Sequence, residues 1–130
     1  MLKFKSSILL AILMGLAMLV TGNAFAEGYG KQKVVYHINY DNPKAQAGAL
    51  RNVQNHINAV GKENLELKVV LHGKGLTLLL EPDALKNTKL AAANANYEMQ
   101  AKIAGLKSQG VAFNVCANTL KGKKVNMDDL

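Results

Sequence analysis

Three short segments of the chain are rich in apolar residues that favour extended structure, and we expect them to form β-strands. They cover residues 33–40 (KVVYHINY), 66–72 (ELKVVLH) and 111–116 (VAFNVC). The first combines β-branched with aromatic residues, and the second is half alternating and half apolar throughout. Glycine, proline or Asx residues border these segments, as is typical of strand ends.

Two longer segments repeat apolar residues every three or four positions, which predicts amphipathic helices. The first begins at Asp41-Asn42-Pro43, an Asx–proline start signal, and ends at Gly61. The second is expected over residues 87–109, with Gly110 as its C-cap. Its buried side is expected to comprise Leu90, Ala93, Asn94, Tyr97, Ala101, Ile103, Ala104 and Leu106.

Two shorter segments complete the pattern. Residues 76–80 fit a short strand or a helical turn equally well, and residues 117–121 are expected to begin a further helix. Strands that alternate with helices predict right-handed β-α-β crossovers and a parallel sheet covered on both faces. We therefore expect one α/β domain, a three-layer sandwich with a mainly parallel sheet. Its buried residues should include Leu50, Val53, Ile57, Val69, Val70, Leu71 and Val115.

The N-terminus resembles an export signal. Lys3 and Lys5 precede an apolar run over residues 8–20, and Ala24-Phe25-Ala26 offers the small residues of a cleavage site. The apolar run is shorter than the roughly 20 residues that span a bilayer. We therefore predict a cleaved signal peptide at residues 1–26, a periplasmic domain at residues 27–130, and membrane contact only during export.

Composition argues against a nucleic-acid partner. The chain has a formal net charge of +7, and the predicted cleavage removes two of its lysines. The remaining lysines form no block, aromatic residues are scarce, and tryptophan is absent from the sequence. A mildly basic solvated surface is therefore the simpler interpretation.

Cys116 is the only cysteine of the sequence, so an intramolecular disulfide is excluded. In an oxidising compartment it is a buried inert residue, an inter-chain disulfide partner or a reactive thiol. It closes the last predicted strand just before a helix start, where unpaired N–H groups favour a thiolate. Packing as a small apolar residue is an equally good interpretation at this point.

Other polar residues are expected at the same edge of the sheet, beyond the carboxyl ends of the strands. His72 is the candidate partner of the Cys116 thiolate, and the simpler interpretation is a hydrogen-bonded histidine at a strand end. Gly73, Lys74, Gly75 and Asn118 are candidates for binding an anion. His37 is expected to be structural and His56 to face solvent, and no histidine–cysteine spacing suggests a metal site. No cofactor fingerprint, phosphate loop or hydrolytic triad is present.

Three segments together carry a family resemblance: "VVYHINYDNPKAQAGALRNVQNHINA", "LKVVLHGKGLTLLL" and "GVAFNVCANTLKG". In this order and spacing they resemble the DsrE/DsrF-like family, in particular its small exported members. The resemblance implies a three-layer α/β fold, homo-oligomers (trimers or hexamers) and sulfur transfer through a cysteine persulfide. Cys116 would accept the sulfur, with His72 nearby. It also implies that relatives continue beyond the NMDDL segment, so we expect a C-terminally truncated domain.

Two functional hypotheses follow. In the first, the protein is a periplasmic sulfur carrier, or a sulfurtransferase, that exchanges a persulfide on Cys116 with a sulfane-sulfur donor and an acceptor thiol. In the second, it is a non-enzymatic oligomeric binding module in which Cys116 only packs. Neither hypothesis requires a cofactor.

Overall fold

The computed structural model describes residues 30–130, and the predicted signal peptide lies outside them. Their sheet has three parallel strands in the order β1-β2-β3. These strands are β1 (Gln32–Ile38), β2 (Leu65–Leu71) and β3 (Ala112–Val115). Leu71 pairs with Ile38 on one side and with Val115 on the other. The carboxyl ends of all three strands therefore meet at one edge of the sheet.

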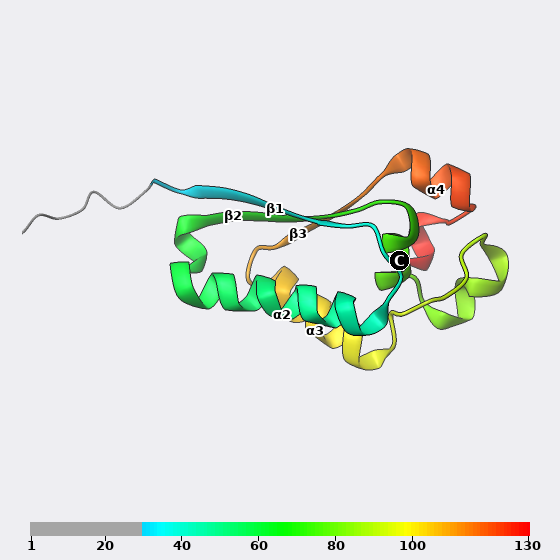
Figure 1. Cartoon of the computed structure of the whole chain (residues 1–130), viewed down its shortest axis with the longest axis horizontal. Helices are drawn as coiled ribbons and strands as arrows, with labels where there is room; N and C mark the ends of the chain where they lie inside the picture. Colours follow the sequence, from blue (N-terminus) through cyan, green and yellow to red (C-terminus); the bar gives the residue numbers. More distant parts are fainter. Residues whose placement is uncertain (1–29) are drawn as a thin grey trace, which may run out of the picture.

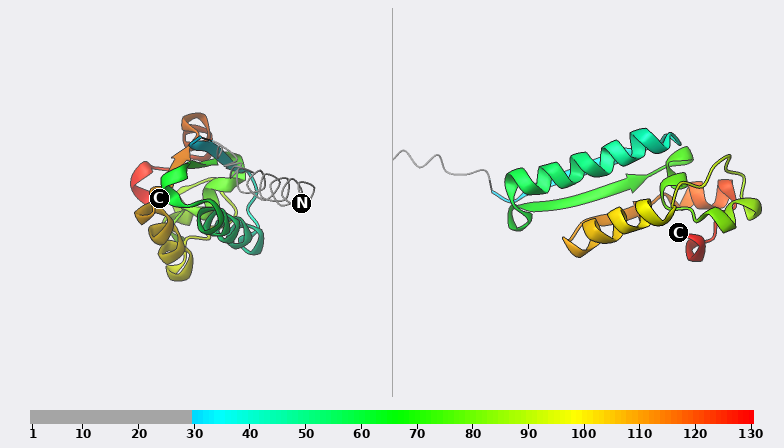
Figure 2. Two further views of the ribbon diagram at one scale, coloured as in Figure 1. Left: turned by 90° about the vertical axis from the view of Figure 1, so that its left-hand side faces the viewer. Right: turned by 90° about the horizontal axis from the view of Figure 1, so that it is seen from below.

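The two long helices, α2 (Pro43–Val60) and α3 (Tyr97–Ser108), lie on the same face of the sheet (Figure 1). Both connect neighbouring strands that step across the sheet in the same direction, so right-handed crossovers place them on one side. The short helix α4 (Ala117–Lys123) lies on the opposite side, beyond the carboxyl ends of the strands (Figure 2). The predicted α/β fold with a parallel sheet is confirmed. Within residues 30–130, however, only one face of the sheet is covered along its length.

The hydrophobic core lies between the sheet and helices α2 and α3. Side chains of β2 alternate along the strand, with Leu65, Leu67, Val69 and Leu71 all buried. From α2 they meet Leu50, Val53 and Ile57 at the predicted three- and four-residue spacing. Val70 was predicted to be buried but is only partly so, because alternation turns it to the uncovered face. Val115 is likewise only partly buried.

The uncovered face carries the other residue of each alternating pair. Val35 is 62% exposed, and His37 from β1 and Asn114 from β3 are also exposed. Ion pairs join Glu66 to Lys33 and to Lys68 across this face, at 3.7 and 3.5 Å. It is therefore a mixed polar and apolar surface.

The second long helix begins ten residues later than predicted at Tyr97, because Asn96 caps it. The Asn96 side-chain oxygen accepts a hydrogen bond from the Met99 amide at 3.0 Å, which satisfies one N–H of the first turn. The shift also changes which residues are buried. Tyr97 is 89% exposed, and Ala101 and Ala104 are exposed as well, so the prediction was wrong for these three residues.

Short 3-10 helices form the remaining regular structure, at η1 (Lys62–Asn64), η2 (Gly73–Leu78), η3 (Pro82–Asn87) and η4 (Met127–Asp129). The ambiguous segment at residues 76–80 therefore begins inside a helical turn. Leu76, Leu78 and Leu80 are fully buried beneath it. Among residues 30–130, no helix is both long enough and apolar enough to cross a membrane.

Candidate functional site

Main-chain hydrogen bonds align the carboxyl ends of the three strands around Cys116. The His72 amide donates to the Ile38 carbonyl of β1 at 3.1 Å. The Cys116 amide donates to the Leu71 carbonyl of β2 at the same distance. Parallel strands lie about 4.8 Å apart, so His72 and Cys116 are neighbours across the edge of the sheet. The two residues that the sequence singled out are thus brought together.

Cys116 is the N-cap residue of α4 and is partly buried. Its extended backbone continues the alternation of Ala112 and Asn114, both of which are exposed on the uncovered face. The carbonyl of Cys116 accepts the first helical hydrogen bond, from the Leu120 amide at 3.0 Å. The thiol therefore lies where a strand ends and a helix begins, as predicted from the sequence.

Thr119 links this thiol to the loop after β2. Its side chain is buried, and its hydroxyl oxygen accepts a hydrogen bond from the Gly73 amide at 3.1 Å. Because that oxygen is already an acceptor, its proton is directed elsewhere, and Cys116 lies three residues back in the same turn. Thr119 was not among the predicted site residues. The only local signal for it was a hydroxyl residue in the first turn after the cysteine.

These donors lower the pKa of the Cys116 thiol below its ordinary value. The Thr119 hydroxyl is the largest cause, followed by the Thr119 amide, and the Asn118 amide adds a smaller effect. Partial burial of the sulfur opposes them. A larger thiolate fraction near neutral pH follows, and the thiolate is the nucleophilic form.

Two histidines lie on the uncovered face at this edge. The rings of His37 and His72 have centroids 6.0 Å apart and are tilted by 45°. Both residues are exposed. His37 was expected to be structural, but its ring points to solvent beside His72.

His56 was expected to face solvent, and here the structure differs. Its Nδ1 lies 3.2 Å from the hydroxyl oxygen of Tyr36, and the two rings pack edge to face. This pair joins α2 to β1 on the covered face. His56 is therefore partly buried and has a structural contact.

The loop after β2 does not form the expected anion cradle. The Gly73 amide donates to Thr119, and the Gly75 amide donates to the His72 carbonyl at 2.9 Å, so neither N–H is free. Lys74 forms an ion pair with Asp41 at 3.4 Å. Asn118 is exposed in the first turn of α4, where its amide faces the sulfur. The loop positions the site instead of supplying anion donors.

Close packing holds this loop in place. A side chain on Gly75 would have its Cβ 2.0 Å from the Ile38 carbonyl oxygen, so only glycine fits. Behind it, the buried amide of Gln46 donates to the Thr77 hydroxyl at 2.9 Å and to the Tyr40 carbonyl at 2.7 Å. Asn94 donates to the Gln46 side-chain oxygen at 2.8 Å. This network joins the loop to the start of α2.

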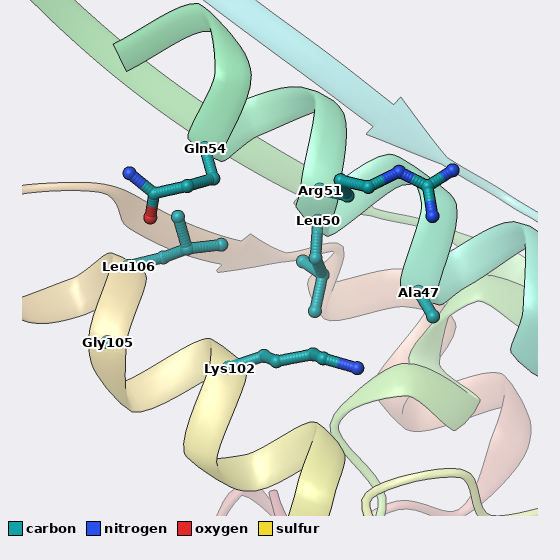
Figure 3. Close-up of a pocket in the computed structure, with 7 residues that line it drawn as sticks. All are labelled: Ala47, Leu50, Arg51, Gln54, Lys102, Gly105 and Leu106. Atoms are coloured by element: carbon teal, nitrogen blue, oxygen red, sulfur yellow. The ribbon is translucent and has the colours of Figure 1, made fainter. Parts of the chain in front are cut away.

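A hollow of about 370 Å³ lies between α2 and α3 (Figure 3). None of the residues around Cys116 line it. Leu50 and Leu106 form its floor, with Arg51 and Lys102 at its rim. Both leucines are almost fully buried already. The accessible lining of the hollow is mostly apolar.

Metal binding has no support in the described part of the chain. Within residues 30–130, no group of three or more His, Cys, Asp or Glu side chains lies close enough to hold a metal ion.

Comparison with known proteins gave one match. Residues 33–130 match the family described as the DsrE/DsrF-like family. This span includes β2, β3, all of β1 except Gln32, and the whole site around Cys116. No curated protein and no solved structure matched the chain.

Proposed function

Because the chain belongs to the DsrE/DsrF-like family, we propose that it is a sulfur carrier in which Cys116 holds sulfane sulfur as a persulfide. Membership in the family supports a role related to sulfur transfer. The choice of Cys116 depends on its position: it is the N-cap residue of α4 and lies beside His72 at the carboxyl ends of the strands. The Thr119 hydroxyl and the amides of the first turn of α4 also lower the pKa of its thiol. A thiolate is needed to attack a sulfane sulfur.

The reaction requires no oxidant. The Cys116 thiolate attacks the outer sulfur of a sulfane donor, the donor's S–S bond breaks, and its electron pair leaves with the rest of the donor. Cys116 then carries a persulfide anion. An acceptor thiolate attacks the outer sulfur of that persulfide and releases the Cys116 thiolate again. One thiol is sufficient for this cycle, and the sequence contains one cysteine.

The proposal also includes the compartment of the protein and its assembly state. The signal-like N-terminus supports export to the periplasm. The uncovered face of the sheet, with Val35 largely exposed, offers a surface for assembly into a homo-oligomer. We therefore propose a periplasmic homo-oligomer that meets its donor and acceptor outside the cytoplasm.

Persulfide formation tests the function directly. The full chain is reduced, incubated with inorganic polysulfide, and analysed by intact-mass spectrometry. The wild type should gain the mass of one sulfur, and Cys116→Ser should not. Circular dichroism and gel filtration of both proteins check that the serine variant keeps its fold and assembly.

Two results would contradict the proposal. An equal sulfur gain on Cys116→Ser would exclude Cys116 as the acceptor. A wild-type thiol that reacts with iodoacetamide only after denaturation would indicate that Cys116 packs as an inert residue, which favours a binding module.

A further inference from the structure

We propose that His37 and His72 together bind the anionic end of the sulfur donor, so that the site selects anionic sulfane-sulfur compounds over neutral ones. This inference rests on the proposed function of Cys116 and adds a substrate class to it. It also adds His37, which lies on a different strand from the other residues of the site.

The two rings are free to act as donors. Of the histidines in the described part of the chain, only His56 has a hydrogen bond to its ring, which it shares with the Tyr36 hydroxyl. His37 and His72 instead expose their rings side by side on the uncovered face. An imidazole carries at least one N–H donor in either protonation state, and both nitrogens donate when it is charged.

Their separation suits one shared acceptor. An acceptor atom lies about 3 Å from the nitrogen that donates to it. Two rings with centroids 6.0 Å apart can therefore both donate to a single anionic group between them. His72 lies one strand from Cys116, and His37 lies on the far side of His72. A donor bound by its anionic end can then direct its sulfane sulfur toward the thiol.

The lysines near the site are less suited to this role. Lys74 is paired with Asp41, and both Lys33 and Lys68 are paired with Glu66. These three lysines therefore share two carboxylates, Asp41 and Glu66, which lowers the attraction of their ammonium groups for a bound anion. Within residues 30–130, neither histidine of the pair forms an ion pair with a carboxylate, so no carboxylate competes with a bound anion for their N–H groups.

Two donors share the required chemistry: thiosulfate and inorganic polysulfide. With thiosulfate, the Cys116 thiolate attacks the outer sulfur, the S–S bond breaks, and sulfite leaves with the electron pair. With polysulfide, the leaving group is a polysulfide that is one sulfur shorter. In both cases the negative charge of the leaving group stays near the histidine pair.

Rates of persulfide formation with anionic and neutral donors, measured at one pH, separate anion binding from a change in the reactivity of the thiol. The wild type, His37→Gln and His72→Gln are each treated with thiosulfate, inorganic polysulfide and a neutral organic trisulfide. Loss of one charge-assisted hydrogen bond should slow the anionic donors by about tenfold and leave the neutral trisulfide unchanged. A selective loss with only one of the two anions identifies which of them the site takes. Lys68→Gln, on the same face, is the control for general surface charge.

Alkylation provides a readout that does not require a persulfide. The ratio of the iodoacetate rate to the iodoacetamide rate should fall in both histidine variants, because only iodoacetate is anionic. This result together with no persulfide on the wild type would contradict the proposed function but support the anion site. An unchanged ratio, or equal slowing of anionic and neutral reagents, would overturn the histidine proposal.

Discussion

The Gly73 amide donates a hydrogen bond to the buried hydroxyl of Thr119 at 3.1 Å, which joins the loop after β2 to the helix that Cys116 caps. The two residues are 46 positions apart in the sequence. Their contact joins the two ends of the β2-α3-β3 crossover beside the thiol. It also explains why the segment around His72 and the segment around Cys116 form one site.

Thr119→Val should raise the pKa of Cys116. The change removes the hydroxyl that contributes most to the lowered pKa, so a smaller fraction of the thiol is ionised at neutral pH. The wild-type rate of iodoacetamide alkylation should rise with pH through a midpoint below about 8.5, the value of a free cysteine. In Thr119→Val this midpoint should move to higher pH.

Thr119→Ser is the matched control, since it keeps the hydroxyl, and its midpoint should stay near that of the wild type. Thr119→Val also leaves the Gly73 amide without its acceptor, which should cost about 1–3 kcal/mol of unfolding free energy. If both variants titrate like the wild type, the Thr119 hydroxyl has no effect on the thiol.

Gly75→Ala should destabilise the protein more than Gly73→Ala. An added Cβ at Gly75 meets the Ile38 carbonyl, and the backbone of β1 or of the loop has to move. At Gly73 the space is open, and the cost comes only from its positive φ of 56°, about 1 kcal/mol. Urea unfolding of the two variants measures the difference, and equal stabilities would show that the loop moves without cost.

Gln46→Leu should cost several kcal/mol of unfolding free energy. The buried Gln46 side-chain N–H groups donate to the Thr77 hydroxyl and the Tyr40 carbonyl, and the Gln46 side-chain oxygen accepts a hydrogen bond from Asn94. Each buried polar group left without a partner costs about 1–3 kcal/mol. Gln54→Leu is the control, because Gln54 is only partly buried and pairs with Gln109 near the surface. Similar losses in both variants would contradict a special role for the buried network.

Leu71→Ala should cost about 2–5 kcal/mol, the usual range for a buried leucine. Leu71 is completely buried at the end of the central strand, where it pairs with both neighbouring strands. Val35→Ala on the uncovered face should change stability little in the monomer. Thermal or urea unfolding compares the two, and a large loss in Val35→Ala would indicate that this face is covered in solution.

The strands and helix α2 could be predicted from the sequence because their signals are local. Asn42 and Pro43 mark the start of α2, and the spacing of Leu50, Val53 and Ile57 marks its buried side. The start of α3 could not, because Asn96 competes with an apolar pattern that continues upstream of it. There the capping bond determines the start, and Tyr97 is left in solvent.

The candidate site was predictable only in part, for the same reason. Cys116 and His72 lie at the carboxyl ends of two strands. In a parallel sheet these ends share one edge, whatever the exact pairing of residues between the strands. Thr119 and His37 act through contacts that depend on that pairing, with Gly73 and with His72 respectively. Periodicity within one segment carries no information about such contacts.

Both crossover helices lie on one face of the sheet, so a sulfur donor or acceptor would approach the Cys116 thiol from the other face. Cys116 is the only cysteine of the sequence, and its single sulfur atom can carry the transferred sulfur of only one donor at a time. Sulfur exchange on Cys116 should therefore follow double-displacement kinetics, in which the remainder of the donor dissociates before the acceptor thiol binds.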